Sequence, residues 1–218
     1  MSYERNMEQP EAITPVEYGG LQMAFDHFNW FLFEGQLVDV FITYQRHAHS
    51  YGYFSADRFA GRVDAEGRHE LALNPDGFIG RTDEQICSTL VHEMVHVWQQ
   101  QYGKPGSRGY HNKQWAAKMK AVGLQPSSTG MPGGKETGQR VSHYVIPGGR
   151  YAGAFEALTM TEWKGLNLES AHREGSRKNK TAFTCPSCDQ RVWGKPDTRV
   201  VCEPCGLKML PPAAETSP

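Results

Sequence analysis

Two histidines and a glutamate within five residues offer the chemistry of a metal-dependent hydrolase. The segment His92-Glu93-Met94-Val95-His96 places its two histidines four positions apart. On a helix, residues at this spacing lie on one face, so both imidazoles can hold one metal ion. Glu93 lies beside them and can accept a proton from a metal-bound water. The pattern therefore predicts a catalytic zinc site with Glu93 as its base.

A site of this kind needs a third protein ligand. Metzincins place it six residues after the second histidine, which is Tyr102 here, and residues 99–103 contain no ligand, so this class is excluded. A glutamate of the thermolysin type is disfavoured, because no Asp or Glu lies between residues 97 and 135. His111 is the one strong ligand in this stretch. We therefore predict a zinc site made by His92, His96 and His111, with water in the open fourth position.

Two other interpretations of these histidines compete with the catalytic one. They are ordinary surface or core histidines, or they form a site that binds metal without catalysing a reaction. Three side chains are candidates for stabilising the oxyanion of a reacting carbonyl, and a structural role is the alternative for each: Tyr110, His143 and Tyr144.

The histidine pair is expected on a well-formed helix. Thr82-Asp83-Glu84-Gln85 has the pattern of a capping box, with Thr82 as N-cap and Gln85 at the third helical position. The helix is expected to run to about Tyr102 and to end at Gly103. Apolar residues within it recur at helical spacing: Ile86, Leu90, Met94 and Val97.

The remaining periodicities predict an α+β fold around that helix. Leu21, Phe25, Phe28 and Leu32 fit one face of a first helix over residues 21–33. The other expected elements are strands in 37–45, 50–63 and 69–75, a supporting helix over 112–123, a long flexible loop over 125–140, a strand in 141–149, and a short helix or further strand in 151–160.

Four cysteines in two pairs predict a second, separate metal site. Cys185 and Cys188 form one CxxC pair, Cys202 and Cys205 form the other, and thirteen residues separate the pairs. This spacing is typical of a structural zinc site closed by four thiolates. A module of about thirty residues cannot bury enough core to fold alone, so zinc binding must supply its stability. The alternatives are unrelated free cysteines and a redox role, and RVWGKPDTRVV between the pairs is expected to form a hairpin.

Cysteine usage and hydropathy indicate an intracellular protein. The fifth cysteine, Cys87, falls within the expected metal-binding helix, where a small buried hydrophobic residue is the expected role. Paired cysteines used for metal indicate a reducing compartment. No apolar run approaches the roughly 20 residues that span a bilayer, and the N-terminus lacks the pattern of a signal peptide. We therefore expect a cytoplasmic protein without a membrane partner.

Charge leaves nucleic-acid binding open. The formal net charge is −1, so no global field favours nucleic acid. From residue 172 to residue 210, however, eight Lys and Arg stand against four Asp and Glu. Phe183 and Trp193 there are candidates for stacking on unpaired bases. Four thiolates around one zinc ion add a net charge of about −2, which leaves this region only mildly positive. The alternative is therefore a solvated ribbon whose aromatic residues belong to its core.

The quoted motifs resemble those of one protein family. TLVHEMVHVWQQQYG followed by GYHNKQW resembles the SprT-like zinc metalloproteases, the group that includes the Spartan DNA–protein crosslink proteases. LQMAFDHFNWFLFEGQLVDVFITY, LALNP and VSHYVIPGG also look like this family, over most of residues 21–210. The resemblance implies that His92, His96 and His111 bind zinc and that Glu93 activates water. It also implies that the cysteine module is a zinc ribbon.

These inferences combine into a domain plan and a function. We expect a flexible acidic tail over 1–19, a zincin-like SprT-like metalloprotease domain over 20–168, a basic linker over 169–180, a zinc ribbon over 181–210 and a tail over 211–218. The expected function is that of a zinc metallopeptidase with one catalytic and one structural Zn²⁺, acting on a protein or peptide substrate. The resemblance implies DNA-associated or DNA-crosslinked substrates, with single-stranded or damaged DNA as a partner. The alternatives are a non-proteolytic, nucleic-acid-associated or transcription-related zinc protein, and a protease whose substrate is unrelated to DNA.

Overall fold

The computed structural model describes residues 11–47, 50–166, 168 and 180–211, which divide into two compact units, 1–170 and 171–218. Most of the expected acidic tail, the basic linker and the final tail lie outside the described residues. None of the described helices has the length and apolarity that crossing a membrane requires.

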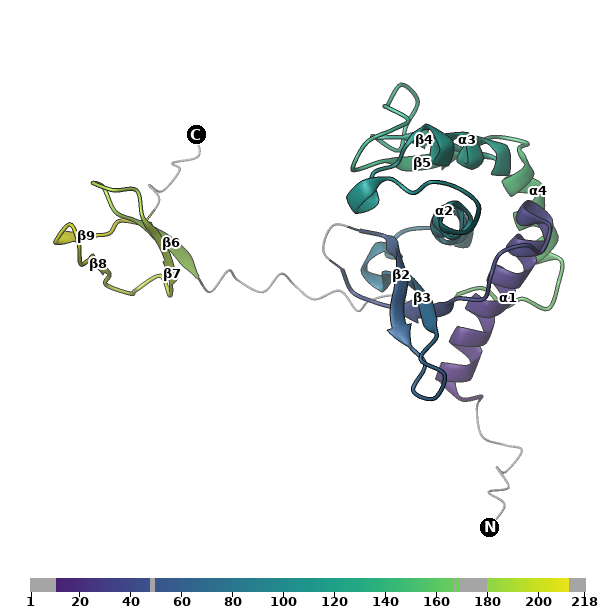
Figure 1. Ribbon diagram of the computed structural model, residues 1–218, viewed down its shortest axis with the longest axis horizontal. Helices are drawn as coiled ribbons and strands as arrows, with labels where there is room; N and C mark the ends of the chain where they lie inside the picture. Colours follow the sequence, from purple (N-terminus) through teal and green to yellow (C-terminus); the bar gives the residue numbers. More distant parts are fainter. Residues whose placement is uncertain (1–10, 48–49, 167, 169–179, 212–218) are drawn as a thin grey trace, which may run out of the picture. The chain divides into compact units, whose positions relative to one another are not determined.

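The first unit has the expected mixed α+β architecture, with α2 at its centre (Figure 1). Helices α1, α3 and α4 and strands β2 and β3 all contact α2. Its regular elements are α1 (Ile13–Phe33), β1 (Phe41–Tyr44), β2 (Gly52–Ala60), β3 (Gly67–Leu73), α2 (Asp83–Tyr102), α3 (Lys113–Val122), β4 (Leu124–Ser127), β5 (Ser142–Val145) and α4 (Arg150–Thr159).

Helix α1 begins earlier than the apolar spacing predicted. It starts at Ile13, so residues 13–19 are helical although we expected them in a flexible tail. Glu17 and Leu21 are buried on the same side of this helix, which explains the difference. The apolar pattern alone did not include a buried carboxylate. The helix ends where Glu34 and Gly35 both adopt positive φ, 61° and 69°.

Strand β3 is the middle strand of a mixed sheet in the order β1-β3-β2. It runs parallel to β1 and antiparallel to β2, which leaves β2 as an edge strand. The buried carboxylate of Glu70 ties the three strands together. It accepts hydrogen bonds from Thr43 Oγ1 of β1 at 2.8 Å and from Tyr53 Oη of β2 at 3.0 Å. Burial of this charged group is therefore compensated by hydrogen bonds.

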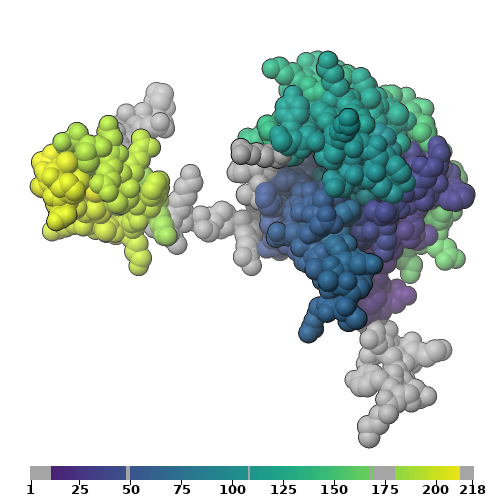
Figure 2. Space-filling model, in the orientation of Figure 1, coloured from purple at the N-terminus to yellow at the C-terminus, as the bar shows by residue number. Residues whose placement is uncertain are grey.

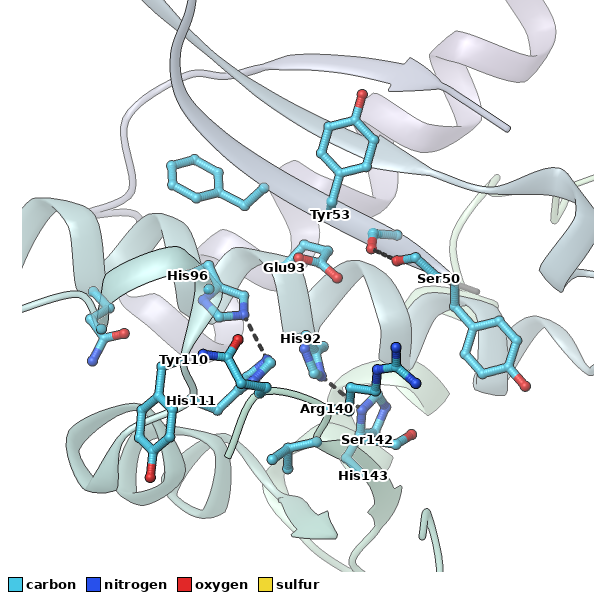
Figure 3. A pocket seen from close by; sticks show the side chains of 18 of the residues that line it. Ser50, Tyr53, His92, Glu93, His96, Tyr110, His111, Arg140, Ser142 and His143 are labelled. Atoms are coloured by element: carbon cyan, nitrogen blue, oxygen red, sulfur yellow. Dashed lines mark hydrogen bonds between the residues drawn. The ribbon is translucent and has the colours of Figure 1, made fainter. Parts of the chain in front are cut away.

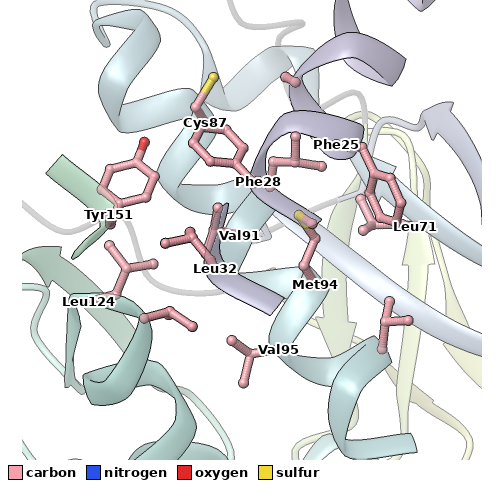
Figure 4. Packing of buried hydrophobic residues seen from close by; sticks show 14 of the residues in the cluster. Phe25, Phe28, Leu32, Leu71, Cys87, Val91, Met94, Val95, Leu124 and Tyr151 are labelled. Atoms are coloured by element: carbon pink, nitrogen blue, oxygen red, sulfur yellow. The ribbon is translucent and has the colours of Figure 1, made fainter. Parts of the chain in front are cut away.

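The core of the first unit forms where α1, α2 and α4 meet (Figure 4). Phe25 and Phe28 of α1 pack with Val91 and Met94 of α2 and with Tyr151 of α4, and all five are essentially inaccessible. Cys87 belongs to the same cluster, which confirms its expected role as a small buried hydrophobic residue. Burial raises the pKa of its thiol. The core therefore fixes α2 from the side opposite β2.

The segment expected as a long flexible loop, 125–140, is partly a strand and is tied by hydrogen bonds. Residues 124–127 form β4, which pairs antiparallel with β5. Beyond it, the amide of Ser128 donates to the carbonyl of Lys135 at 2.8 Å. Composition could not reveal this, because the Gly, Ser and Thr residues that suggest flexibility also make turns. Gly123 precedes β4 with φ +97°, and a Cβ there would lie 2.6 Å from Tyr151 N, so only glycine fits.

The second unit is built from two short hairpins: β6 (Thr181–Thr184) pairs with β7 (Arg191–Gly194), and β8 (Val201–Cys202) pairs with β9 (Leu207–Lys208). The hairpin expected between the two cysteine pairs is therefore wrong. Each CxxC segment instead makes the turn of its own hairpin, with a positive φ at Asp189 and at Gly206. The reason is geometric, since a turn that folds back brings both cysteines of a pair to one ion.

Candidate active site and metal centres

The structure brings together the three histidines predicted as ligands. His92 and His96 come from successive turns of α2, and His111 comes from the residue before the N-cap of α3. One nitrogen from each ring lies within 4.8 Å of the others. His96 Nε2 and His111 Nε2 are 3.2 Å apart and face each other (Figure 3). Three imidazole nitrogens at this separation fit a zinc ion.

Trp115 forms the floor beneath the three rings. Its indole is fully buried, and its ring centroid lies 4.8 Å from that of His92, 5.4 Å from that of His96 and 4.3 Å from that of His111. It belongs to α3, one turn after the N-cap Asn112. A rigid aromatic surface shared by all three rings restricts their side-chain rotations and therefore preorganises the site.

His111 is held from two directions. Gln99 of α2 donates from Nε2 to Asn112 Oδ1 at 2.8 Å, and Asn112 Oδ1 also accepts the amide of Trp115 at 3.1 Å. These bonds fasten the start of α3 to α2. On its other side His111 exchanges two backbone hydrogen bonds with Gly138, at 2.9 and 3.1 Å, and its Nδ1 lies 3.1 Å from the Gly138 carbonyl. The loop after β4 thereby contributes to the site.

Glu93 lies on the wall of the site that faces β2 (Figure 3). The side chain is only 5% exposed, and burial raises the pKa of its carboxyl group to about 8. Gly52 of β2 leaves room for it: a Cβ at position 52 would lie 3.3 Å from Glu93 Cγ and 2.8 Å from the Ala72 carbonyl oxygen. The glycine is therefore needed for space rather than for its backbone angles.

The histidines are neutral in this environment. Burial, followed by the charges of neighbouring histidines, lowers the pKa of His92 well below its ordinary value and lowers the pKa of His96 to about 3. Burial also lowers the pKa of His111. Neutral imidazoles are the form that binds a metal ion, so the cluster is ready for a cation without losing protons.

A cavity of about 540 Å³ opens over these residues. Its walls come from β2, α2, the segment around residues 105–111, and residues 139–143. In the space-filling view the blue atoms of the β2 and β3 region and the teal atoms of the α2 and α3 region make adjoining parts of the unit's surface (Figure 2). The cavity is large enough for several residues of a peptide, and its apolar and polar groups are mixed.

The three oxyanion candidates differ in their placement. Tyr110 lines the cavity, but its hydroxyl points away from the three histidines (Figure 3). Tyr144 is not among the described residues that line the cavity. His143 is partly buried beside His92, with the two Nδ1 atoms 3.1 Å apart, and desolvation lowers its pKa to about 3. A neutral, doubly engaged imidazole of this kind fits a structural role better than an oxyanion donor.

The four predicted cysteines also converge, in the second unit. Their sulfur atoms lie within 4.8 Å of one another, which fits a zinc ion. Cys185 and Cys202 are buried, whereas Cys188 is exposed. Hydrogen bonds from the backbone at Cys188 and Ser187 lower the pKa of Cys185, whereas hydrogen bonds among the thiols raise the pKa of Cys202 and Cys205.

The aromatic residues of the second unit separate into core and surface. Phe183 packs in the small core with Cys185, Cys202 and Met209 and is only 3% exposed, so the suggestion that it stacks on bases is wrong. Trp193 on β7 is 66% exposed. Strand alternation accounts for the difference, because Phe183 points into the hairpin and Trp193 points out.

Sequence reasoning did not identify several residues that support the site. Ser88, Gln99 and Gly138 are buried or close to a ligand and bond to site residues. For Ser88 and Gln99 a signal existed, because they lie four residues before His92 and three after His96, on the helical face of the pair. For Gly138 there was none, since the bond is made across 27 residues.

Comparisons with known proteins find one family and one relative. A model of the SprT-like family matches residues 21–135, which is 115 of the 218 residues and includes the histidine cluster and Glu93. An uncharacterized protein in the mucB 3′ region of Salmonella typhimurium is 49% identical over 49 residues. That match covers 22% of this chain and 66% of the relative, so the relative is similar only over a short segment.

Proposed function

The chain belongs to the SprT-like family, and from this premise we propose that it is a zinc-dependent endopeptidase. In this proposal His92, His96 and His111 hold the catalytic zinc ion and Glu93 is the general base. One observation carries it: three neutral imidazoles and a buried carboxylate converge on a cavity bounded by the edge strand β2.

A zinc ion bound there would supply Lewis acidity, lowering the pKa of a water and polarising the scissile carbonyl. The chain's own residues do the rest. Glu93 accepts the proton of the attacking water and delivers it to the leaving amine. Burial strengthens the carboxylate as a base, and the charge of a bound cation would favour its ionised form. Trp115 and Gln99 keep the ligands in place while the substrate changes shape.

The finer parts of the proposal concern substrate, partner and location. We propose a protein substrate associated with or crosslinked to DNA, and a second, structural zinc ion in the four-cysteine site. Support for the DNA contact comes from the exposed Trp193 and from basic residues on the same unit, Arg191, Lys195, Arg199 and Lys208. Single-stranded DNA is the probe that suits such a surface, because unpaired bases can stack on an exposed indole. A reducing, intracellular location would keep the thiolates available to metal.

Glu93→Gln tests the proposal. The amide keeps the size of the side chain but cannot accept the proton, so cleavage of an unstructured protein should fall by a factor of about 10² to 10⁴. Zinc content should not change. Glu156→Gln, the same chemical change at an exposed position on α4, is the matched control and should leave cleavage intact.

The same assay separates the alternatives. Wild-type protein and Glu93→Gln are compared on a DNA-binding protein, with and without single-stranded DNA. Undiminished cleavage by Glu93→Gln would refute the assigned base. Absence of cleavage by the zinc-loaded wild type, together with DNA binding, would favour a non-proteolytic nucleic-acid-associated protein. Cleavage that DNA neither stimulates nor directs would favour a protease unrelated to DNA.

A further inference from the structure

Two polar residues that are not among the proposed ligands form a continuous path to His92. His143 comes from β5, beyond the part of the chain that the family model matches, and Ser88 lies one turn before His92 on α2. His143 Nδ1 lies 3.1 Å from His92 Nδ1, and His143 Nε2 lies 2.9 Å from Ser88 Oγ. Ser88 Oγ in turn lies 2.8 Å from the Gln85 carbonyl oxygen.

The acceptor at the end of this path sets the direction of every hydrogen bond in it. Ser88 Oγ donates its one hydroxyl hydrogen to the Gln85 carbonyl, which also accepts from Arg81 Nη2. The oxygen of Ser88 is then the acceptor for His143 Nε2–H. A neutral imidazole carries one N–H, so Nδ1 of His143 is itself an acceptor.

It follows that His92 carries its hydrogen on Nδ1 and keeps the lone pair on Nε2. That is the tautomer a metal ligand needs when the metal is bound through Nε2. In the reverse arrangement His143 would carry its hydrogen on Nδ1, and His92 would carry its hydrogen on Nε2. That hydrogen would prevent His92 Nε2 from binding a metal. His111 has the same arrangement by simpler means, because its Nδ1 faces the Gly138 carbonyl at 3.1 Å.

We propose that His143 is a positioning residue for the zinc ligand His92, with Ser88 fixing the tautomer of His143. The inference rests on the proposed function, because it takes His92 as a zinc ligand. Partners of this kind hold the ligand ring in orientation and make its free nitrogen more basic, and their loss costs about 10-fold to 100-fold in metal affinity. His143 lines the cavity but in this role acts through His92 rather than on the metal.

The first test compares two substitutions of His143 in the full chain. Phe keeps an aromatic ring but offers no acceptor, whereas Gln offers a carbonyl oxygen in its place. Metal affinity is measured by competition with a chromophoric chelator, using Co²⁺ so that thiolate absorption identifies the four-cysteine site separately. His143→Phe should weaken the histidine site about 10-fold to 100-fold, and His143→Gln should recover part of that loss. The four-cysteine site is the internal reference and should not change.

The second test leaves the imidazole ring of His143 unchanged. Ser88→Ala removes the acceptor of His143 Nε2–H and should weaken metal binding by a smaller factor. Thr159→Ala is the matched control, because Thr159 Oγ1 donates to the carbonyl three residues earlier, as Ser88 does, but on α4. Imidazole ¹H–¹⁵N correlation spectra of the wild type should show hydrogen on Nε2 of His143 and on Nδ1 of His92, a signature that packing alone does not require.

Each outcome decides something different. If His143→Phe binds metal at the histidine site as tightly as the wild type does, the positioning role is wrong and the proposed function still stands. A His143 that carries its hydrogen on Nδ1 overturns the positioning role too, and this readout holds even where His143→Phe does not fold. Failure of the wild type to bind metal at the histidines overturns the proposed function first, and the inference with it.

Discussion

The two candidate metal sites are built in opposite ways. The histidine site lies on a helix that a large apolar core already holds, and none of its ligands belongs to that core. In the second unit two of the four ligands, Cys185 and Cys202, are themselves core residues beside Phe183 and Met209. The first unit can therefore fold before it binds metal, whereas the second has little else to bury.

The difference follows from the size of each unit and matches the chemistry of each site. A unit with its own core can hold three ligands in place and leave a coordination position open towards a cavity, as catalysis requires. A unit of about thirty residues would gain its stability from a bound ion, with all four positions around that ion taken by protein. Four predictions test this contrast, in order of decreasing effect.

Metal removal should unfold one unit and spare the other. A strong chelator should abolish the protection of β6 to β9 in hydrogen exchange, because structural zinc contributes about 10–16 kcal/mol to modules of this type. Protection in α2 should persist, since its core does not involve the ion. Persistent protection of the second unit after its zinc is removed would show that the unit folds without metal.

Met94→Ala should strongly destabilise the first unit only. Met94 lies inside the HExxH segment but is fully buried in the core, so its truncation should lower the free energy of unfolding by about 2–5 kcal/mol. Urea denaturation measures this. Met160→Ala, at a position 76% exposed, is the control and should change stability little. Equal effects of the two substitutions would contradict the placement of the core.

Gly52→Ala should affect catalysis as well as stability. The added Cβ has to displace the Ala72 carbonyl or the Glu93 side chain, and overpacking of this kind costs about 1–3 kcal/mol. We expect a lower kcat with zinc content unchanged, measured as cleavage rate per bound zinc. Gly153→Ala on α4 has no atom within 4 Å of the new Cβ and is the matched control. If both variants cleave at the wild-type rate, the contact between β2 and Glu93 does not contribute to catalysis.

Thr82→Ala should have the smallest effect. It removes the side-chain acceptor of the capping box on α2 and should cost about 1 kcal/mol. Metal affinity should not change, because the histidines lie more than two turns further along the helix. Thr82→Ser keeps the cap and should keep the stability. The melting temperature measures stability, and chelator competition measures metal affinity. Weaker metal binding by Thr82→Ala would show that the site depends on the start of the helix.

Local patterns predicted most of the elements correctly. The capping box of α2 is confirmed with both of its hydrogen bonds, and α3 begins after Asn112 and ends before Gly123. These signals act within a few residues, so the sequence displays them directly. The start of α1 and the strand β4 depended on partners further along the chain, and the local pattern misjudged both. The pairing in the second unit was misjudged for another reason, because each CxxC segment forms a turn of its own hairpin.

The sequence by itself determined which residues offer ligands: the spacing in α2 and in the CxxC pairs follows from helix and turn geometry alone. Only the tertiary structure decided what surrounds them. The Trp115 floor, the space over Gly52 and the path from Ser88 through His143 join segments separated by tens of residues. Such contacts arise when a whole core packs, because burial and hydrogen bonding are satisfied jointly by distant residues. The family match spans the three histidines and Glu93, and the packing shows how the chain orients them.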